Sequence, residues 1–291
     1  MASVLAIVSA FFYGVSIILA RIGLRNADSI RGAVISMGFS FIVSLMLLFY
    51  SLPLSHFAIS GLFFFVLAGI SGPCLGRIFL FVGIKRVGSS IASPLQSTKP
   101  LFSAVAAIIV LGEGMNAPLA IATIIMVCGL AVISSEESGG QIEHQWTKKD
   151  LLFPIMAGAG YGISHVFRKI GLNVMVEPLF GVTVQNAAAL SFSLGLVSFR
   201  KTEKKILSVG KKPLAFFGLS GISAMIGQTS LFYALKSGNV VIVSPLSSIT
   251  PLFVLLLGGL FLRSMEQITW KIILGTVLIV GATVLITLLS R

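Results

Sequence analysis

The chain contains the same sequence pattern twice. Residues Tyr13–Leu24 read YGVSIILARIGL, and residues Tyr161–Leu172 read YGISHVFRKIGL. Residues Ser93–Phe102 (SPLQSTKPLF) return as residues Ser244–Phe253 (SPLSSITPLF). The first pair is 148 residues apart (13 to 161), the second is 151 apart (93 to 244), and both occur in the same order. The chain therefore contains a duplicated unit of about 150 residues.

The composition indicates that the duplicated unit folds in a membrane. Hydrophobic residues make up 56% of the chain and charged residues only 10%, whereas a soluble domain carries about 25% charged residues. So few polar side chains cannot cover the surface of a water-soluble core. The lipid bilayer is therefore expected to be the solvent for most of the outer surface.

Ten apolar runs of about 20 residues, the length that crosses a bilayer, are separated by short polar breaks. They predict an all-α membrane protein with ten transmembrane helices. The runs cover residues 2–21, 31–51, 57–84, 88–111, 117–134, 151–170, 178–199, 213–235, 240–262 and 268–289.

The runs divide into two groups of five. Residues 2–134 form the first predicted repeat, residues 135–149 a polar linker, and residues 150–287 the second repeat. Because five is odd, the second repeat enters the membrane from the opposite side. The sequence therefore predicts two inverted repeats around a central cavity, an arrangement typical of secondary transporters.

Basic residues are distributed unevenly between the predicted loops. The odd-numbered loops carry most of the Lys and Arg residues, and the even-numbered loops hold only Arg168, Lys169 and Lys236. The positive-inside rule then places the odd-numbered loops in the cytoplasm and both termini outside. The net charge of +12 is thus a topology signal, and no basic surface large enough to bind nucleic acid is expected.

Each repeat carries two prolines within one apolar run: Pro94 and Pro100 in the first, Pro245 and Pro251 in the second. Proline removes a backbone donor and disrupts the preceding helical turn. Carbonyl groups freed in a membrane need partners, so such helices often line a cavity or bend at a moving joint. The alternative is a simple kink that helps helix packing.

Two basic residues lie within predicted helices, Arg77 in the third run and Lys99 between the two prolines of the fourth. The 151-residue offset pairs Arg77 with Gln228 and Lys99 with Thr250. Polar residues at equivalent places in both repeats predict one cavity lined from both sides. The other candidates for its lining are Gln96, His165, Tyr13 and Tyr161.

The sign of the two buried charges suggests the type of substrate. No Asp or Glu lies deep in any predicted helix, and a buried cation without a partner is costly. We therefore expect a small metabolite with a carboxylate or phosphate, held by Arg77 and Lys99. The alternatives are that Arg77 extends to the membrane interface, and that the substrate is a neutral or cationic amino acid or drug.

Other classes of function fit the sequence less well. Both Asp residues, Asp28 and Asp150, lie in predicted loops, and no HExxH motif occurs, so neither an aspartyl pair nor a zinc site is expected. Cys74 and Cys128 fall in apolar runs and are expected to be buried and unpaired. We predict no catalytic residues, metal or cofactor. A channel or lipid scramblase remains the alternative class, although channel pores usually show rings of polar groups.

Several short motifs resemble the EamA-type permeases of the drug/metabolite transporter superfamily, over about residues 2–134 and 150–287. They are Tyr13-Gly14 and Tyr161-Gly162, residues 83–88 (GIKRVG) before Ser93-Pro94 and Pro100, Leu111-Gly112-Glu113 with Gly129, and Ser244-Pro245, Pro251, Glu266 and Gly275.

The resemblance implies ten helices around a cavity that opens alternately to either side, and a cargo of metabolites or drugs. It places the termini in the cytoplasm, against the count of basic residues. Two features depart from the pattern: residues 262–266 read LRSME in place of the Leu-Gly-Glu motif, and Lys99 occupies a position that is often small or polar. A multi-pass location in a prokaryotic cell membrane is expected, and the oligomeric state is not predicted.

Overall fold

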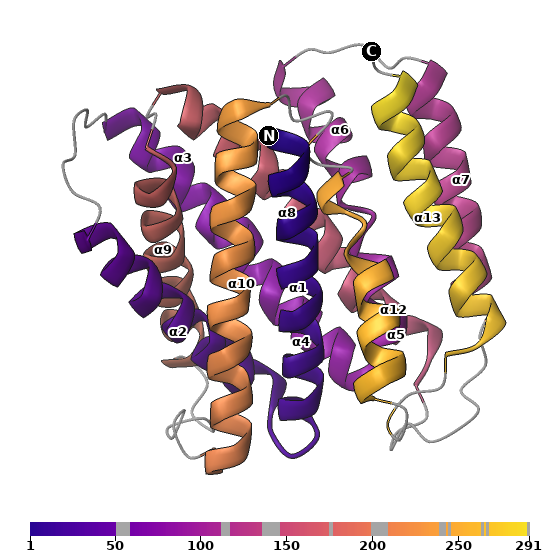
Figure 1. The fold of residues 1–291 in the computed structure, drawn as a ribbon, viewed down its shortest axis with the longest axis horizontal. Helices are drawn as coiled ribbons and strands as arrows, with labels where there is room; N and C mark the ends of the chain where they lie inside the picture. The colour runs from indigo at the N-terminus through magenta and orange to yellow at the C-terminus, as the bar shows by residue number, and fades with distance from the viewer. Residues whose placement is uncertain are drawn as a thin grey trace.

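The structure is a computed structural model that describes residues 1–50, 59–111, 117–135, 146–174, 177–198, 209–238, 243, 246–262, 265 and 268–289. Within these residues every assigned element is a helix, and the helices form one bundle (Figure 1). The elements are α1 (Ala2–Leu24), α2 (Ser29–Tyr50), α3 (Ile59–Gly69), η1 (Ile70–Gly76), α4 (Arg77–Val87), α5 (Ser89–Gln96), α6 (Lys99–Leu111), α7 (Ala117–Ser134), η2 (Lys148–Leu151), α8 (Leu152–Val174), α9 (Pro178–Ser198), α10 (Lys211–Ser237), α12 (Thr250–Phe261) and α13 (Trp270–Leu289).

The predicted all-helical class is confirmed for the described residues. In the described part of the chain, five helices are long and apolar enough to cross a membrane, and three apolar helices are shorter. The long ones are Ala2–Leu24, Ser29–Tyr50, Gly61–Val87, Pro178–Ser198 and Lys211–Ser237; the shorter ones are Ile124–Ile133, Thr250–Phe261 and Trp270–Ala282.

The bundle has an apolar exterior and a partly polar interior. Large apolar side chains such as Phe49, Leu256 and Trp270 are exposed, while Arg77, Lys99 and many serines are buried. A soluble protein shows the opposite distribution. This distribution is therefore that of a chain whose outer surface faces lipid.

The third apolar run is one span with an irregular centre. α3 continues into the π-helical segment η1, which contains Pro73, and α4 follows without a gap. Proline cannot donate the hydrogen bond of a regular helical turn, and a π-bulge is one way in which a helix adapts to such a defect. Arg77 is the first residue after this irregular segment.

The fourth run is two helices with a break between them. α5 ends at Gln96, a turn covers Ser97 and Thr98, and α6 begins at Lys99. Pro100 is then the second residue of α6, where no backbone donor is needed. The single helix that the sequence predicts over residues 88–111 is therefore wrong at this point.

The second repeat has a turn at the equivalent place. Residues Ser248 and Ile249 form the turn, α12 begins at Thr250, and Pro251 follows. Adding the 151-residue offset to Ser97 and Thr98 gives these same two positions. Pro245 lies outside the described residues.

Helices from the two halves of the chain pack against each other in exchanged pairs. α1 packs on α10 and α8 on α3; α1 also contacts α12, and α8 contacts α6. In addition α2 packs on α9, and α7 packs on α13 at one side of the bundle (Figure 1). The first four of these contacts thus form two pairs in which the halves change roles, and the last two each join equivalent helices of the two halves.

Small residues allow close contacts between these helices. A Cβ atom added to Gly162 of α8 would lie 2.6 Å from the carbonyl oxygen of Lys99, at the start of α6. In the equivalent contact, a Cβ added to Gly14 of α1 would lie 2.9 Å from Cβ of Phe253 and 3.7 Å from the carbonyl oxygen of Thr250. Both broken helices are therefore held directly against the first helix of the opposite half.

Basic side chains bind carbonyl groups at the helix ends in an equivalent way within each half. Near the end of α1, Arg21 donates from Nη1 to the carbonyl oxygen of Ile84 at the end of α4 (3.5 Å). Near the end of α8, Lys169 donates from Nζ to the carbonyl oxygens of Leu235 (3.0 Å) and Gly238 (3.3 Å) at the end of α10. Cations at helix C-termini satisfy free carbonyl groups and oppose the helix dipole favourably.

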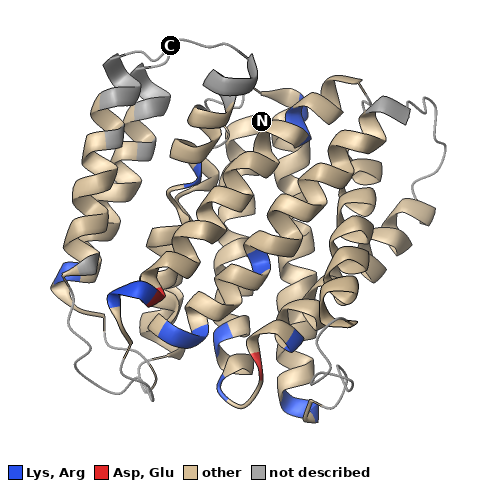
Figure 2. Ribbon diagram, turned by 180° about the vertical axis from the view of Figure 1, so that it is seen from behind, with Lys and Arg blue, Asp and Glu red and all other residues tan. Residues whose placement is uncertain are grey.

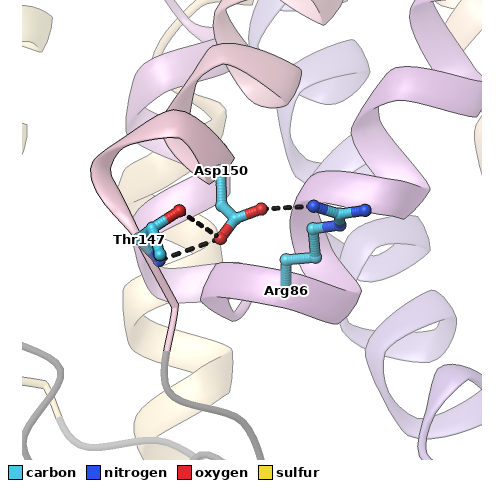
Figure 3. Close-up of polar contacts among 3 residues, drawn as sticks. All are labelled: Arg86, Thr147 and Asp150. Atoms are coloured by element: carbon cyan, nitrogen blue, oxygen red, sulfur yellow. Dashed lines mark hydrogen bonds and ion pairs between the residues drawn. The ribbon is translucent and has the colours of Figure 1, made fainter.

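One further contact joins the end of α4 to the beginning of α8. Asp150 accepts hydrogen bonds through Oδ2 from the backbone nitrogen (2.9 Å) and Oγ1 (3.0 Å) of Thr147, and through Oδ1 from Nη1 of Arg86 (Figure 3). Most of the predicted linker, residues 135–149, lies outside the described residues. The described end of that segment is thus fixed to the first half of the chain.

Candidate substrate-binding site

Arg77 projects from α4 into the bundle. It is 2% exposed, and its Nη1 donates to the hydroxyl oxygens of Ser36 (3.4 Å) and Ser40 (3.1 Å) on α2. Its Nη2 has no hydrogen-bond partner among the described residues. The guanidinium thus lies against α2 and keeps one free donor group.

α8 presents three polar residues on one face. Tyr161, His165 and Arg168 are spaced four and three residues apart, which places them on the same side of a helix. All three are buried, at 4%, 2% and 0% exposure. The count of basic residues between the apolar runs predicts that Arg168 lies in a loop. That prediction is wrong, because α8 continues to Val174 and Arg168 is fully buried within it.

The Arg168 side chain contacts residues of α9 and α10. Its Nε donates to Oε1 of Gln185 on α9 (2.7 Å), and its Cζ lies 5.5 Å from the ring centre of Phe232. Tyr13, Tyr161 and Arg77 are its electrostatic neighbours. The Tyr13 hydroxyl lies near enough to the guanidinium to interact with it, but no hydrogen bond of ordinary length and angle is made within the described residues by Nη1 or Nη2 of Arg168 or by this buried hydroxyl.

Two glutamines extend this polar region toward α10. Nε2 of Gln185 donates to Oε1 of Gln228 at 3.4 Å, and both side chains are fully buried. Nε2 of Gln228 is without a partner among the described residues. Sequence reasoning missed Gln185, although the adjacent polar pair Gln185-Asn186 inside an apolar helix was an available signal.

Lys99 approaches the region from the break between α5 and α6. Its Nζ donates to the carbonyl oxygen of Ser247 (3.5 Å) and lies 5.9 Å from the ring centre of Tyr13. Thr250 Oγ1 donates to the same Ser247 oxygen at 3.0 Å. His165 has both Arg168 and Lys99 as electrostatic neighbours.

The structure thus brings most of the predicted site residues together with Arg168 and Gln185, which were not predicted. Gln96 is buried, but its described contact is through its backbone carbonyl oxygen and not its side-chain amide. That oxygen faces Gly158 of α8. Three side chains, Arg77, Lys99 and Arg168, define what we call the buried cationic cluster. Figure 2 shows Lys and Arg positions midway along the helices as well as at their ends.

No described acidic residue balances the buried cationic cluster. Among the described residues the acidic side chains are Asp28, Asp150 and Glu177; Asp28 and Glu177 are exposed. Asp150 is engaged by Arg86 and Thr147. Partial burial acts to raise the pKa of Asp150, but the hydrogen bonds from Thr147 and Arg86 outweigh it, so this pKa lies below its ordinary value.

The described residues include no group of three or more His, Cys, Asp or Glu side chains that could hold a metal ion. Cys74 is buried and unpaired, and Cys128 is also unpaired but exposed on α7. The expected burial of Cys128 is therefore wrong, because its side of α7 faces outward. Glu113 and Glu266, from the family motifs, lie outside the described residues.

Taken together, the apolar exterior, the membrane-length helices and the buried polar interior define a multi-pass membrane protein. Residues 1–135 and 148–288 match the EamA-like transporter family. The chain belongs to this family, as the motifs in its two halves indicated.

Two archaeal relatives and one solved structure extend the comparison. An uncharacterized transporter from Archaeoglobus fulgidus is 25% identical over 215 residues, which cover 74% of this chain and 72% of that protein. An uncharacterized protein from Methanocaldococcus jannaschii is 30% identical over 138 residues, 47% of this chain and 96% of that protein. The latter thus has about the length of one matched segment.

One solved crystal structure of a protein is similar to this chain with a TM-score of 0.68. The match covers 100% of this chain and 97% of the solved chain. The two sequences are 17% identical. This likeness shows that the fold is shared.

Proposed function

We propose that this chain is a secondary transporter that carries a small anionic metabolite across the membrane by alternating access. The observation that carries the proposal is the buried cationic cluster, in which three cations are buried with no described acidic partner. A charged side chain near the centre of a bilayer costs at least ~2.5 kcal/mol on insertion scales. A bound carboxylate or phosphate offsets that cost and gives the cations a function.

The transport mechanism rests on ten transmembrane helices in two inverted repeats, residues 2–134 and 150–287, joined by residues 135–149. Arg21 and Ile84 place the ends of α1 and α4 together, and Arg86 and Asp150 place the beginning of α8 at that same end. α1 therefore runs toward the end from which α8 starts. This opposite direction of equivalent helices supports an inverted relation between the repeats.

The two broken helices supply the moving parts of the proposed mechanism. Their turns, at Ser97-Thr98 and Ser248-Ile249, lie next to Lys99 and Thr250 and thus beside the cluster. Interrupted helices near the membrane midplane are a common feature of transporter binding sites. A change at either turn would move the neighbouring binding groups relative to the other helices.

We place the transporter in the cell membrane of a prokaryote, consistent with the archaeal source of two relatives. Its partners are the bilayer and the small-molecule substrate. No cofactor is required by this mechanism, because the chain's own cations bind the substrate.

The proposal is tested by thermal-shift screening of the purified protein in detergent. The ligands are amino acids, organic acids, sugar phosphates, nucleotide sugars and cationic drugs. A ligand that binds only the folded state at a hundred times its Kd stabilises that state by about 2.7 kcal/mol. We expect an anionic metabolite to raise the Tm, and that shift to be lost in the double variant Arg77→Met, Lys99→Met.

The matched control is Lys148→Met, Lys149→Met, which removes the same charge from two exposed positions and should keep the shift. Hits are then tested for counterflow in proteoliposomes. A shift with neutral or cationic compounds alone would contradict anion binding. Flux of ions or lipids without saturation by a metabolite would indicate a channel or scramblase instead.

A further inference from the structure

We propose that Arg168 is the residue that anchors the substrate, by gripping its anionic group with Nη1 and Nη2, and that Gln185 is the positioning residue that holds the guanidinium in place. The inference rests on the proposed function, since it assumes that the cluster binds an anion. It assigns the anchor to a residue that neither the repeat nor the family motifs indicate.

The distribution of free donors among the three cations supports Arg168 as the anchor. Lys99 donates to a carbonyl oxygen, and its ammonium has no planar pair of terminal nitrogens. Arg77 donates through Nη1 to two serines, so that of its two terminal nitrogens Nη2 alone has no partner among the described residues. Neither terminal nitrogen of Arg168 makes a hydrogen bond of ordinary geometry within the described part of the chain, and its side chain is 0% exposed. A guanidinium with both terminal nitrogens free matches a carboxylate or phosphate, which accepts two parallel hydrogen bonds.

The remaining donor of Arg168 is used for orientation. Nε donates to Oε1 of Gln185 at 2.7 Å, and the ring of Phe232 lies 5.5 Å from Cζ. These two contacts fix the plane of the guanidinium from α9 and α10. A neutral amide does so without cancelling the positive charge, whereas a carboxylate at position 185 would cancel it.

A glycine of the π-helical segment lies beside Arg168. A Cβ atom added to Gly72 would lie 2.5 Å from Oγ of Ser164 and 3.3 Å from Nη2 of Arg168. A side chain at this position would therefore press on the free end of the guanidinium. The absence of a side chain at Gly72 lets η1 approach α8 closely without a side chain pressing on Nη2 from this position.

Free donors of uncharged neighbours surround the anchor. The hydroxyl of Tyr13 and Nε2 of Gln228 are both buried and both lack a partner among the described residues. Arg77, with its own free nitrogen, is an electrostatic neighbour of Arg168. A region so rich in donors suits an anion with several oxygens, such as an organic acid or a phosphate ester.

The decisive variant is Gln185→Glu. The new carboxylate takes the place of the amide oxygen 2.7 Å from Nε of Arg168. Gln228, whose Nε2 has no partner in the described part of the structure, can turn its amide to donate to it. The variant should therefore fold with an unchanged or higher Tm, yet bind the anion identified by the screen roughly tenfold to a hundredfold more weakly.

Two further variants complete the test, with affinity measured by calorimetry in detergent. Arg168→Lys keeps the charge but removes the planar pair of terminal nitrogens, and should weaken anion binding at least about tenfold. Ser198→Glu adds the same charge at the exposed end of α9 and should bind like the wild type. Carboxylates and phosphate esters of similar size, titrated separately, identify which anionic group is bound.

Wild-type affinity in Gln185→Glu, measured for an anion that the unmodified protein binds, would overturn the anchoring role while leaving the proposed function intact. Unchanged affinity in Arg168→Lys would contradict the claim that both terminal nitrogens bind the anion. If the unmodified protein binds no anion at all, the proposed function fails, and this inference with it.

Discussion

The contact between Arg86, Thr147 and Asp150 gives a prediction whose size can be worked out from the structure. Replacing Asp150 by Asn keeps the shape of the side chain but leaves one acceptor oxygen in place of two. In the wild type, Oδ2 accepts from both donors of Thr147 and Oδ1 faces Arg86. The amide group of Asn must therefore face one of these donors and lose its hydrogen bond.

A hydrogen bond to a charged group contributes about 1.5–3 kcal/mol. The ion pair itself adds at most about 1 kcal/mol, because the Arg86 side chain is 51% exposed. We expect Asp150→Asn to lower the free energy of unfolding by about 2 kcal/mol, or roughly 3 °C in Tm for a chain of this size. The assay is thermal unfolding in detergent, followed by intrinsic fluorescence.

Asp28→Asn is the matched control. Asp28 Oδ1 accepts from the backbone nitrogens of Ile30 (2.9 Å) and Arg31 (3.2 Å) at the beginning of α2. Asn serves about as well as Asp in this role, so the control should change stability by less than about 0.5 kcal/mol. Equal effects of the two substitutions would refute the reasoning.

The ion pair between Arg86 and Asp150 also predicts that the stability of the protein depends on pH. The pKa of Asp150 is lower in the folded protein than its ordinary value, so the contribution of this carboxylate is fully present above about pH 4. It is lost as the pH falls through the lowered pKa. The difference in Tm between wild type and Asp150→Asn should therefore be constant from about pH 5 to pH 8 and shrink below about pH 4. A difference that grows on acidification would contradict this sign.

Two other predictions concern helix contacts. Gly162→Ala should lower the free energy of unfolding by about 2 kcal/mol or more, because the new Cβ would meet the backbone oxygen of Lys99 at 2.6 Å and backbone cannot move as a side chain can. The control is Gly38→Ala, which should not destabilise the protein because nothing lies within 4 Å of the added Cβ. Thermal unfolding compares the two variants. Lys169→Met should lower the free energy of unfolding by about 1 kcal/mol, since the carbonyl oxygens of Leu235 and Gly238 lose their donor. Backbone hydrogen exchange at the end of α10 should become faster in the same variant.

The sequence predicted the parts of the site that repeat. Tyr13 and Tyr161 lie in the duplicated motif, and the prolines marked the place where both broken helices have their turn. The 151-residue offset paired Lys99 with Thr250, and the two side chains do meet at the carbonyl oxygen of Ser247. Duplication carries this information because equivalent residues occupy equivalent places in the two halves.

The sequence did not predict Arg168, for a physical reason. Two adjacent basic residues after an apolar run look like the end of a membrane helix. In the structure the helix continues: Lys169 binds the end of α10, while Arg168 points to the other side and is buried. Only the packing of α8 against η1, α6 and α9 separates the roles of these neighbours.

The other differences also arise from packing. Gln185 was missed because a neutral polar residue hardly changes the apolar character of a helix. The π-helical turn of η1 depends on Pro73 and on close contacts such as that of Gly72 with Ser164, and hydropathy does not show these. The outward position of Cys128 follows from the pairing of α7 with α13.

The central claim is that the buried cationic cluster binds an anionic group. The most direct measurement is calorimetric titration of the purified protein with the anionic metabolite found by screening, and with its neutral amide or ester of the same size. We predict binding of the anion and a loss of at least about tenfold in affinity for the neutral analogue. Equal affinity for the two compounds would show that the charge of the substrate is not recognised, and would contradict the claim.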